Sequence, residues 1–491
     1  MAKNIAKNSF YNVTYKFLNV SFTVIAAAYV SRILMPEGVG KINSAQNIAQ
    51  YFVLLASLGI PMYGIKAIAV ASGNQDETNR VYSELLTINA VSTLICSFVY
   101  YGIILIHPFF AERRALYSIC GLMIPFRLLH NEWYYQGREE YRYIMMRSLI
   151  IKAVMLVFVF LTVRSEADYL IYAFLLVAAT EANNMFNFIH AGKTVRIQLK
   201  GLNLKRHLRP ILALLAVALS VEIYTLADIT MLTFMKGDSA VGLYTHAEKG
   251  IGVIKMLISA VCMVFLPRLS RHYSSGEKEE FDGLVQKGFR TLFYFAIPAT
   301  VGIILISEDL IRFLFGTAFL PAADTMRILA LSILTVVFSN FIGNQVLIAL
   351  GKEKQVMVST AAGACLNVIV NAVLIPRWSI NGAAVASVLT QLVVVGVQYY
   401  YVRKDVRIRF SARYILSLAL GTILMVFGVC LIGKSMSHYI PRLLCMCVTG
   451  VAVFCVITLS MKNEVALSFM QVIKRVGKRI GSGARGQEEE P

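Results

Sequence analysis

Long apolar runs separated by short polar segments constrain this chain more than any other feature. A transmembrane helix needs about 20 mostly apolar residues to cross the hydrocarbon layer of a bilayer. The 491-residue sequence contains fourteen candidate runs of this kind. They cover approximately residues 10–34, 45–71, 81–106, 115–135, 146–163, 168–190, 211–235, 244–266, 289–306, 327–350, 355–375, 381–402, 412–433 and 440–461. This pattern predicts an all-α polytopic membrane protein.

Composition supports the same class of protein. Hydrophobic residues make up 57% of the chain and charged residues 15%, whereas soluble domains contain about 45–50% and about 25%. These values exclude a disordered chain, a collagen-like repeat and a coiled coil. All eight cysteines lie inside apolar runs and none forms a CxxC pair, so we interpret them as small apolar side chains.

The basic residues predict the orientation. The chain carries 47 Lys and Arg against 28 Asp and Glu, a net charge of +19. Nucleic acid binding is not expected, because the basic residues form short clusters between apolar runs. With a cytoplasmic N-terminus, 31 of the 47 lie in inside segments and 11 in outside ones. The positive-inside rule therefore predicts a multi-pass membrane protein with both termini in the cytoplasm.

Two parts of the chain resemble one another. Residues 31–61 and 233–267 each give a run, a short loop ending in Val-Gly, a run that begins with polar residues, and a proline. Val39-Gly40 and Val241-Gly242 are 202 residues apart. The repeat predicts two pseudo-symmetric six-helix lobes, which is a transporter design. We expect an N-terminal lobe at 1–206, a C-terminal lobe at 207–405, two further helices at 406–461, and a basic cytoplasmic tail at 462–491.

Polar and basic side chains within the apolar runs indicate a binding cavity. A charge at mid-bilayer costs about 2.5–3.5 kcal/mol on insertion scales, so such residues are expected to face a polar interior or to snorkel. Lysine and arginine attract phosphate, and amides suit sugar hydroxyls. In the alternative interpretation, some charges only pair to hold helices together. The candidate substrate-binding residues are Lys16, Asn19, Arg32, Gln46, Arg127, Lys152, Asn184, Lys249, Lys255, Asn344 and Asn371.

Two acidic residues in one run are candidates for coupling. Glu222 and Asp228 could bind a coupling proton or cation, or could neutralise Lys249 and Lys255, and both interpretations stay open. The sequence contains neither GxxxxGK[ST] nor HExxH, so ATP hydrolysis and zinc catalysis have no support. We therefore expect a non-enzymatic transporter that needs no metal or other cofactor.

Several motifs resemble one family of transporters. They are SRILMPEGVGKINSAQNIAQYFVLLASLGIPMYGIKAIA (31–69), NEWYYQGREEY (131–141), SAVGLYTHAEK (239–249), NQVLIALGKEKQ (344–355) and NVIVNAVLIPRWSINGAAVASVLTQ (367–391). The chain thereby resembles the Wzx-type polysaccharide flippases of the multidrug/oligosaccharidyl-lipid/polysaccharide exporter superfamily. Members often have Gly-Pro-Glu-Gly after the first helix, whereas this chain has Met35-Pro36-Glu37-Gly38.

The resemblance implies a MATE-like fold of twelve core helices plus two. It also implies that a polyprenyl-diphosphate-linked oligosaccharide moves from the inner to the outer leaflet, beside a polysaccharide polymerase and glycosyltransferases. Alternatives within transport are a flippase for lipid II or a spore-wall precursor, and a cation-coupled small-molecule exporter. A membrane polymerase or ligase is disfavoured, because those enzymes usually carry a large outside loop, and none here exceeds roughly twenty residues.

Overall fold

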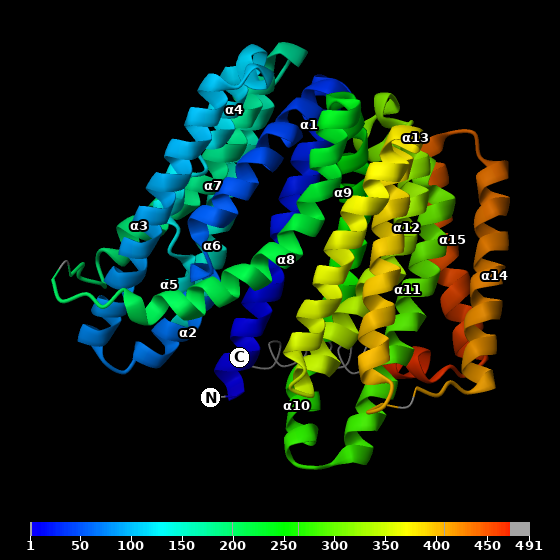
Figure 1. Cartoon of the computed structure of the whole chain (residues 1–491). Helices are drawn as coiled ribbons and strands as arrows, with labels where there is room; N and C mark the ends of the chain where they lie inside the picture. Colours follow the sequence, from blue (N-terminus) through cyan, green and yellow to red (C-terminus); the bar gives the residue numbers. More distant parts are fainter. Residues whose placement is uncertain (1, 199, 264, 407, 472–491) are drawn as a thin grey trace, which may run out of the picture. The chain divides into compact units, whose positions relative to one another are not determined.

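The computed structural model describes residues 2–198, 200–263, 265–406 and 408–471, although not the side chains of 2–20, 217, 220, 221, 223, 224, 260 and 263. All regular structure within these ranges is helical, as expected (Figure 1). The α-helices are α1 (Ala2–Ser57), α2 (Ile60–Ala71), α3 (Gln75–Ile106), α4 (Arg114–Gly121), α5 (Glu132–Gly137), α6 (Tyr141–Thr162), α7 (Tyr169–Ala191), α8 (Lys205–Lys236), α9 (Asp238–Met263), α10 (Leu266–Ser274), α11 (Lys278–Phe315), α12 (Ala322–Ser339), α13 (Glu353–Val402), α14 (Ala412–Ser435) and α15 (Tyr439–Ser460). Short 3₁₀ segments are η1 (Pro108–Arg113), η2 (Pro125–Leu129), η3 (Glu166–Asp168) and η4 (Thr317–Phe319), and η5 (Asn340–Leu347) is a π-helix.

The helices confirm a polytopic membrane protein. In the described part of the chain, eight helices are long and apolar enough to cross a bilayer. Two of these stretches, Ser21–Ala71 and Glu353–Val402, each cover a pair of the expected runs. The total of fourteen spans stays a prediction.

Some expected runs are interrupted; the run 45–71, for example, is divided between α1 and α2. Residues 115–135 were expected to form one span, but the structure divides them into α4, η2 and α5. Pro125 begins η2 and cannot donate an i→i−4 hydrogen bond, and its ring disfavours continuation of an α-helix. The expectation of one continuous helix here was therefore wrong.

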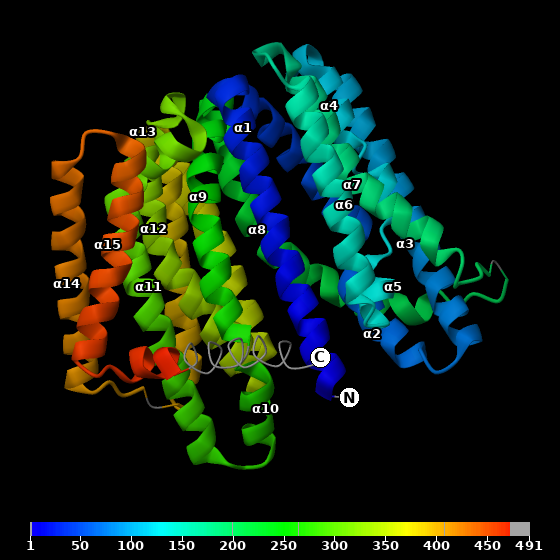
Figure 2. The ribbon, with the colours of Figure 1, turned by 180° about the vertical axis from the view of Figure 1, so that it is seen from behind.

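The chain forms two compact units. Unit 1 comprises residues 1–249, 314–322 and 360–386, and unit 2 comprises 250–313, 323–359 and 387–491. The division into lobes at 206 and 405 stays a prediction. In unit 1, α1 packs against α3, α4, α6 and α8, and α7 packs against α4 and α6. In unit 2, α14 and α15 lie side by side (Figures 1 and 2). Gly421 and Gly450 allow this close approach, since a Cβ at either would lie 3.1–3.2 Å from a side chain of the other helix.

The same backbone break occurs at both copies of the sequence repeat. Helix α1 is interrupted at Met35, which has φ 57° and ψ 175°, and Pro36 follows it. Helix α8 ends at Gly237, which has φ 81° and ψ −177°. This positive-φ, extended-ψ conformation is natural for glycine and strained for methionine. Met35 and Gly237 have the same sequence spacing as Gly40 and Gly242.

After these breaks, α1 and α9 cross very closely. A Cβ on Gly242 would overlap the Pro36 carbonyl group, and a Cβ on Gly40 would overlap the Asp238 carbonyl group. The two glycines also face one another, because a Cβ on Gly242 would lie 3.2 Å from the Gly40 nitrogen. Only glycine at both positions permits this separation of the backbones.

Local sequence signals define the connections between helices. The Asn74 side chain caps α3 by accepting hydrogen bonds from the amides of Asp76 and Glu77, at 2.9 and 3.3 Å. Before α7, the Asp168 carboxylate accepts from the amides of Arg164 and Ser165, at 2.9 and 2.8 Å. These hydrogen bonds lower the pKa of the Asp168 carboxyl, because they stabilise its charged form.

Candidate functional site

A buried carboxylate lies at the centre of a polar cluster in unit 1. Asp228 of α8 is 6% exposed. Tyr244 of α9 donates its hydroxyl proton to Oδ2 of Asp228 at 2.6 Å. On α13, Nδ2 of Asn367 and Nδ2 of Asn371 donate to Oδ1 of Asp228, at 3.0 and 2.6 Å. Because these three residues come from two other helices, the cluster, here called the Asp228 cluster, connects α8 to α9 and α13.

The two asparagines of the Asp228 cluster also contact one another. Asn371 donates to Oδ1 of Asn367 at 3.0 Å, one helical turn away. Both asparagines are fully buried. Within the described part of the chain, Oδ1 of Asn371 is buried without a hydrogen-bond partner. The carboxylate itself is a hard oxygen ligand of the kind that small cations prefer.

A second polar layer connects α8 and α9 to α1. Asn47 donates to Oγ1 of Thr230 at 2.7 Å, and the Tyr51 hydroxyl lies 3.0 Å from the same atom. Nδ2 of Asn43 donates to Oγ1 of Thr245 at 2.7 Å. The polar face of the second expected span therefore contacts other helices of its own unit.

An ion pair lies where α8 ends and α9 begins. Arg113 pairs with the buried Asp238 carboxylate. Oδ1 of Asp238 accepts from the Ser44 hydroxyl at 3.0 Å, and Thr233 donates to Ser44 at 3.1 Å. A cavity of about 670 Å³ opens beside this pair and is also lined by Glu37, Glu112 and Lys236. The Lys236 ammonium donates to the Pro376 carbonyl at 3.0 Å, so the ion pair and the lysine both join helices.

Another buried carboxylate, Glu84 of α3, holds the chain that leads into α8. His207 and Arg206 both bind Oε2 of Glu84, at 2.6 and 2.8 Å. The Asn203 amide donates to Oε1 at 2.6 Å, and the Tyr63 hydroxyl lies 2.8 Å from Nδ1 of His207. These contacts fasten residues 203–207 to α2 and α3, which indicates a structural role.

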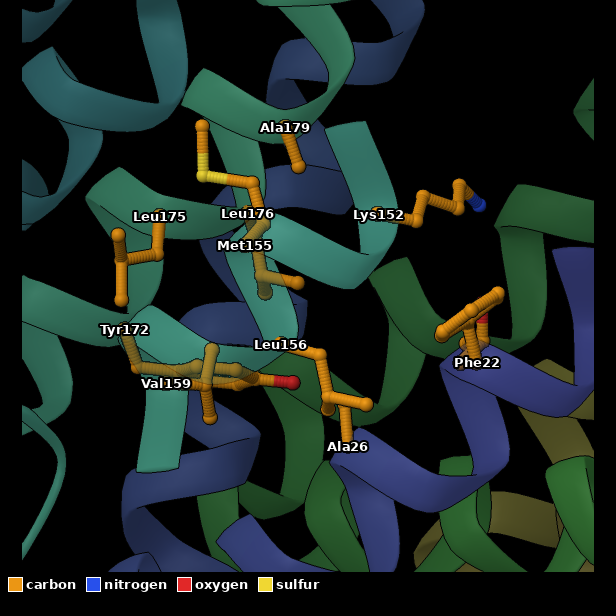
Figure 3. A pocket seen from close by; sticks show the side chains of 11 residues that line it. Phe22, Ala26, Lys152, Met155, Leu156, Val159, Tyr172, Leu175, Leu176 and Ala179 are labelled. Carbon is orange, nitrogen blue, oxygen red and sulfur yellow. The ribbon is translucent and has the colours of Figure 1, made fainter. Parts of the chain in front are cut away.

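The predicted cations do not converge in the described contacts. Nε of Arg127 donates to the Ser57 hydroxyl, and the Arg127 carbonyl accepts from Asn89 at 3.0 Å. Arg127 thus links η2 to α1 and α3, as the helix-holding interpretation expects. Lys152 of α6 lines a mainly apolar pocket of about 90 Å³ between α1, α6 and α7, and its side chain extends away from Tyr172 and Leu175 (Figure 3).

The remaining predicted residues are distributed over both units. Lys16 and Asn19 lie on α1, but their side chains lie outside the described part. Asn184 is buried and donates to Glu181 at 2.8 Å, and the exposed Asn344 lies 3.4 Å from Oδ1 of Asn340. Glu222 is half-buried and accepts from Thr225 at 3.3 Å. Arg32 is exposed, and the half-buried residues are Gln46 and Lys249 in unit 1 and Lys255 in unit 2.

Among the predicted residues, the contacts between described side chains therefore join Asp228 to Asn371. Sequence reasoning also recognised Asn367 as a polar residue of its span, but not the Tyr244 hydroxyl. It missed the Arg113–Asp238 and Glu84–His207 pairs. Their one sequence signal is an acid at or near the end of an apolar run, and the partners lie more than 120 residues away.

Comparisons with known proteins agree with this architecture. A family model described as "Polysaccharide biosynthesis protein" matches residues 5–272, which is more than half of the chain. A model described as "Lipid II flippase MurJ" matches residues 251–450. A relative named "Putative O-antigen transporter" from Escherichia coli K12 is 19% identical over 408 residues, covering 82% of this chain and 97% of that protein. "Probable low-salt glycan biosynthesis flippase Agl15" from Haloferax volcanii is 27% identical over 188 residues, covering 38% and 40%.

Solved structures show which fold this is. The lipid II flippase MurJ in an inward closed conformation has a TM-score of 0.73 at 15% identity, covering 91% of this chain and 99% of that chain. An inward-facing MATE multidrug transporter has a TM-score of 0.61 at 15% identity, covering 78% and 93%. These likenesses confirm the predicted MATE-like fold.

Proposed function

Because the chain belongs to the polysaccharide biosynthesis protein family, we propose that it is a Wzx-type flippase for a polyprenyl-diphosphate-linked oligosaccharide. The substrate moves from the cytoplasmic to the outer leaflet of a bacterial cell membrane. The observation that carries this proposal is the family match over residues 5–272, together with the match along 97% of a relative named as an O-antigen transporter. Both termini are cytoplasmic, and a polysaccharide polymerase and glycosyltransferases act on the same substrate.

The substrate would be held by the predicted cations and amides. Lys16, Lys249 and Lys255 attract the diphosphate, and the side-chain amides of Asn19 and Asn184 form hydrogen bonds with sugar hydroxyls. What supports the assignment of Lys249 and Lys255 is that both are half-buried on α9. A diphosphate would attract these half-buried ammonium groups.

The Asp228 cluster is the proposed coupling site. A proton or a small cation can bind the carboxylate, which Nδ2 of Asn371 contacts, and Oδ1 of Asn371 is a buried oxygen of the same cluster without a hydrogen-bond partner among the described residues. The donors come from α9 and α13, so occupancy of Asp228 would change how these helices hold α8. Glu222 is the weaker candidate, because Thr225, which donates to its carboxylate, lies on the same helix.

Reconstitution in vesicles tests the function. The full chain is placed in liposomes that contain a fluorescent polyprenyl-diphosphate oligosaccharide, and an added glycosidase measures how much sugar reaches the external leaflet. Protein-dependent exposure is expected. Gradient-dependent exposure should be lost in Asp228→Asn and kept in Glu222→Gln. No exposure by a folded, inserted protein would contradict the flippase proposal, whereas equal gradient dependence in all three proteins would contradict only the coupling role of Asp228.

A lipid II flippase is the second candidate function. The MurJ family model matches residues 251–450, and the MurJ structure is similar over 91% of the chain. The same vesicles loaded with lipid II distinguish the two candidates. Faster exposure of lipid II than of the longer oligosaccharide would favour this second function.

A further inference from the structure

A basic cavity lies in unit 2 where three connections between helices meet. It has a volume of about 230 Å³. His272 lies near the end of α10, Lys278 begins α11, and Leu350 comes from the connection before α13. Lys404 and Asp405 follow the end of α13. The positive-inside rule assigns all three connections to the cytoplasm, which places the cavity at the inner face of the membrane.

The charges around this cavity, here called the α10–α13 cavity, leave two cations for a ligand. Lys352 forms an ion pair with Asp405 at 2.6 Å and so neutralises the one acid in the lining. His272 is held by Glu277. Among the residues that the structure describes, no acid lies within ion-pair distance of Lys278 or Lys404. Both lysines are exposed, so their ammonium groups are available to an anion at the cavity mouth.

The floor of the cavity is apolar. Phe281 and Leu350 are buried, and Tyr273 lies with its ring centroid 5.7 Å from that of Phe281. Cations at the mouth above an aromatic and aliphatic floor suit an amphiphile with an anionic group. The volume lies below the roughly 300–1,000 Å³ of pockets for drug-sized ligands, so a headgroup fits better than an oligosaccharide.

We propose that the α10–α13 cavity binds the phosphate headgroup of an anionic phospholipid from the cytoplasmic leaflet. Lys278 and Lys404 contact the phosphate, and Tyr273 with Phe281 packs against the glycerol and the first carbons of the lipid. This site lies on connections of unit 2 and shares no residue with the Asp228 cluster. It concerns the annular lipid rather than the transported sugar, so it does not depend on the proposed function.

Binding of a short-chain fluorescent phosphatidylglycerol to the purified full chain tests the proposal, with phosphatidylcholine as the neutral comparison. The double variant Lys278→Gln/Lys404→Gln should bind phosphatidylglycerol about tenfold more weakly and phosphatidylcholine equally, because each lysine near a membrane surface adds attraction for anionic lipid. Lys278→Arg/Lys404→Arg should keep most of the affinity. The matched control is Lys354→Gln, which removes an exposed lysine of α13 outside the cavity lining.

The proposal is overturned if the double Gln variant binds phosphatidylglycerol as the wild type does, or if Lys354→Gln weakens it equally. It is also overturned if a polyprenyl diphosphate displaces the probe at far lower concentration than phosphatidylglycerol itself, because the occupant would then be the substrate. Displacement by inorganic phosphate alone at equal concentration would likewise exclude a lipid site. Since no transport is measured, these outcomes are independent of the flipping assay.

Discussion

The break in α1 predicts that, at Met35, a glycine variant is more stable than an alanine variant, the reverse of the usual order in a helix. At an ordinary helix position, glycine is about 1 kcal/mol less stable than alanine. Met35 has φ 57° and ψ 175°, a region that costs a residue with a Cβ about 1–3 kcal/mol. Met35→Ala keeps that strain, whereas Met35→Gly removes it and loses about 0.4–1 kcal/mol through the freer unfolded chain. Both variants lose the contacts that the Met35 side chain makes beyond Cβ. The free energy of unfolding of Met35→Gly should therefore exceed that of Met35→Ala by about 1 kcal/mol.

Thermal unfolding in detergent, followed by the monomer fraction that survives heating, measures this ranking. About 1 kcal/mol corresponds to a shift of the melting temperature of about 2 °C for a large cooperative unit. Met62 supplies the control, because it is an exposed methionine within the regular helix α2. At this position the alanine variant should have a higher melting temperature than the glycine variant. If Met35→Ala were the more stable variant, as at Met62, the strain assigned to Met35 would be wrong.

Three further predictions follow from the structure. Gly242→Ala should lower the melting temperature by several degrees, because its Cβ would lie 2.9 Å from the Pro36 carbonyl carbon. The control Gly252→Ala, on the same helix, meets no atom within 4 Å and should be neutral or stabilising. Equal stability of the two variants would refute the close crossing of α1 and α9. Lys255→Ala should remain inserted but lose most flipping, and Lys255→Arg should keep part of it, because the charge survives with different geometry; full activity of the alanine variant would exclude a phosphate role. Cysteines introduced near Lys200 should resist an impermeant thiol reagent in intact cells, whereas those at 308–319 should react, and the reverse pattern would overturn the orientation.

Much of the helical fold could be predicted because each span needs only a local apolar run. The runs at 412–433 and 440–461 became α14 (Ala412–Ser435) and α15 (Tyr439–Ser460) almost unchanged. Helix interruptions were harder to predict. The run around Pro125 looked continuous in hydropathy, because a proline costs a helix its hydrogen bonds without making the run less apolar.

The candidate site could be predicted only in part, because polar contacts in a membrane protein join distant segments. Asn371 and Asp228 were both recognised as polar residues inside apolar runs, yet their contact spans 143 residues. Glu84 contacts His207 across 123 residues, and Arg113 contacts Asp238 across 125. Such pairs have no spacing rule in the sequence. What the sequence does indicate is that a buried charge needs a partner, although not which one.

The contact between Gly40 and Gly242 explains why the Val-Gly pair was the easiest part of the repeat to recognise in the sequence. The predicted pseudo-two-fold relation of the two lobes would place each residue and its equivalent at equal distances from the axis, so equivalents that touch would lie beside it. Gly40 and Gly242 touch in this way, and so do Asn43 and Thr245, which are also 202 residues apart. Met35 and Gly237 adopt the same broken backbone at the entrance to this crossing. Residues far from an axis meet different neighbours in each half and can diverge independently. Residues beside it pack against their own equivalents, so one steric demand acts on both copies and the glycine remains in each.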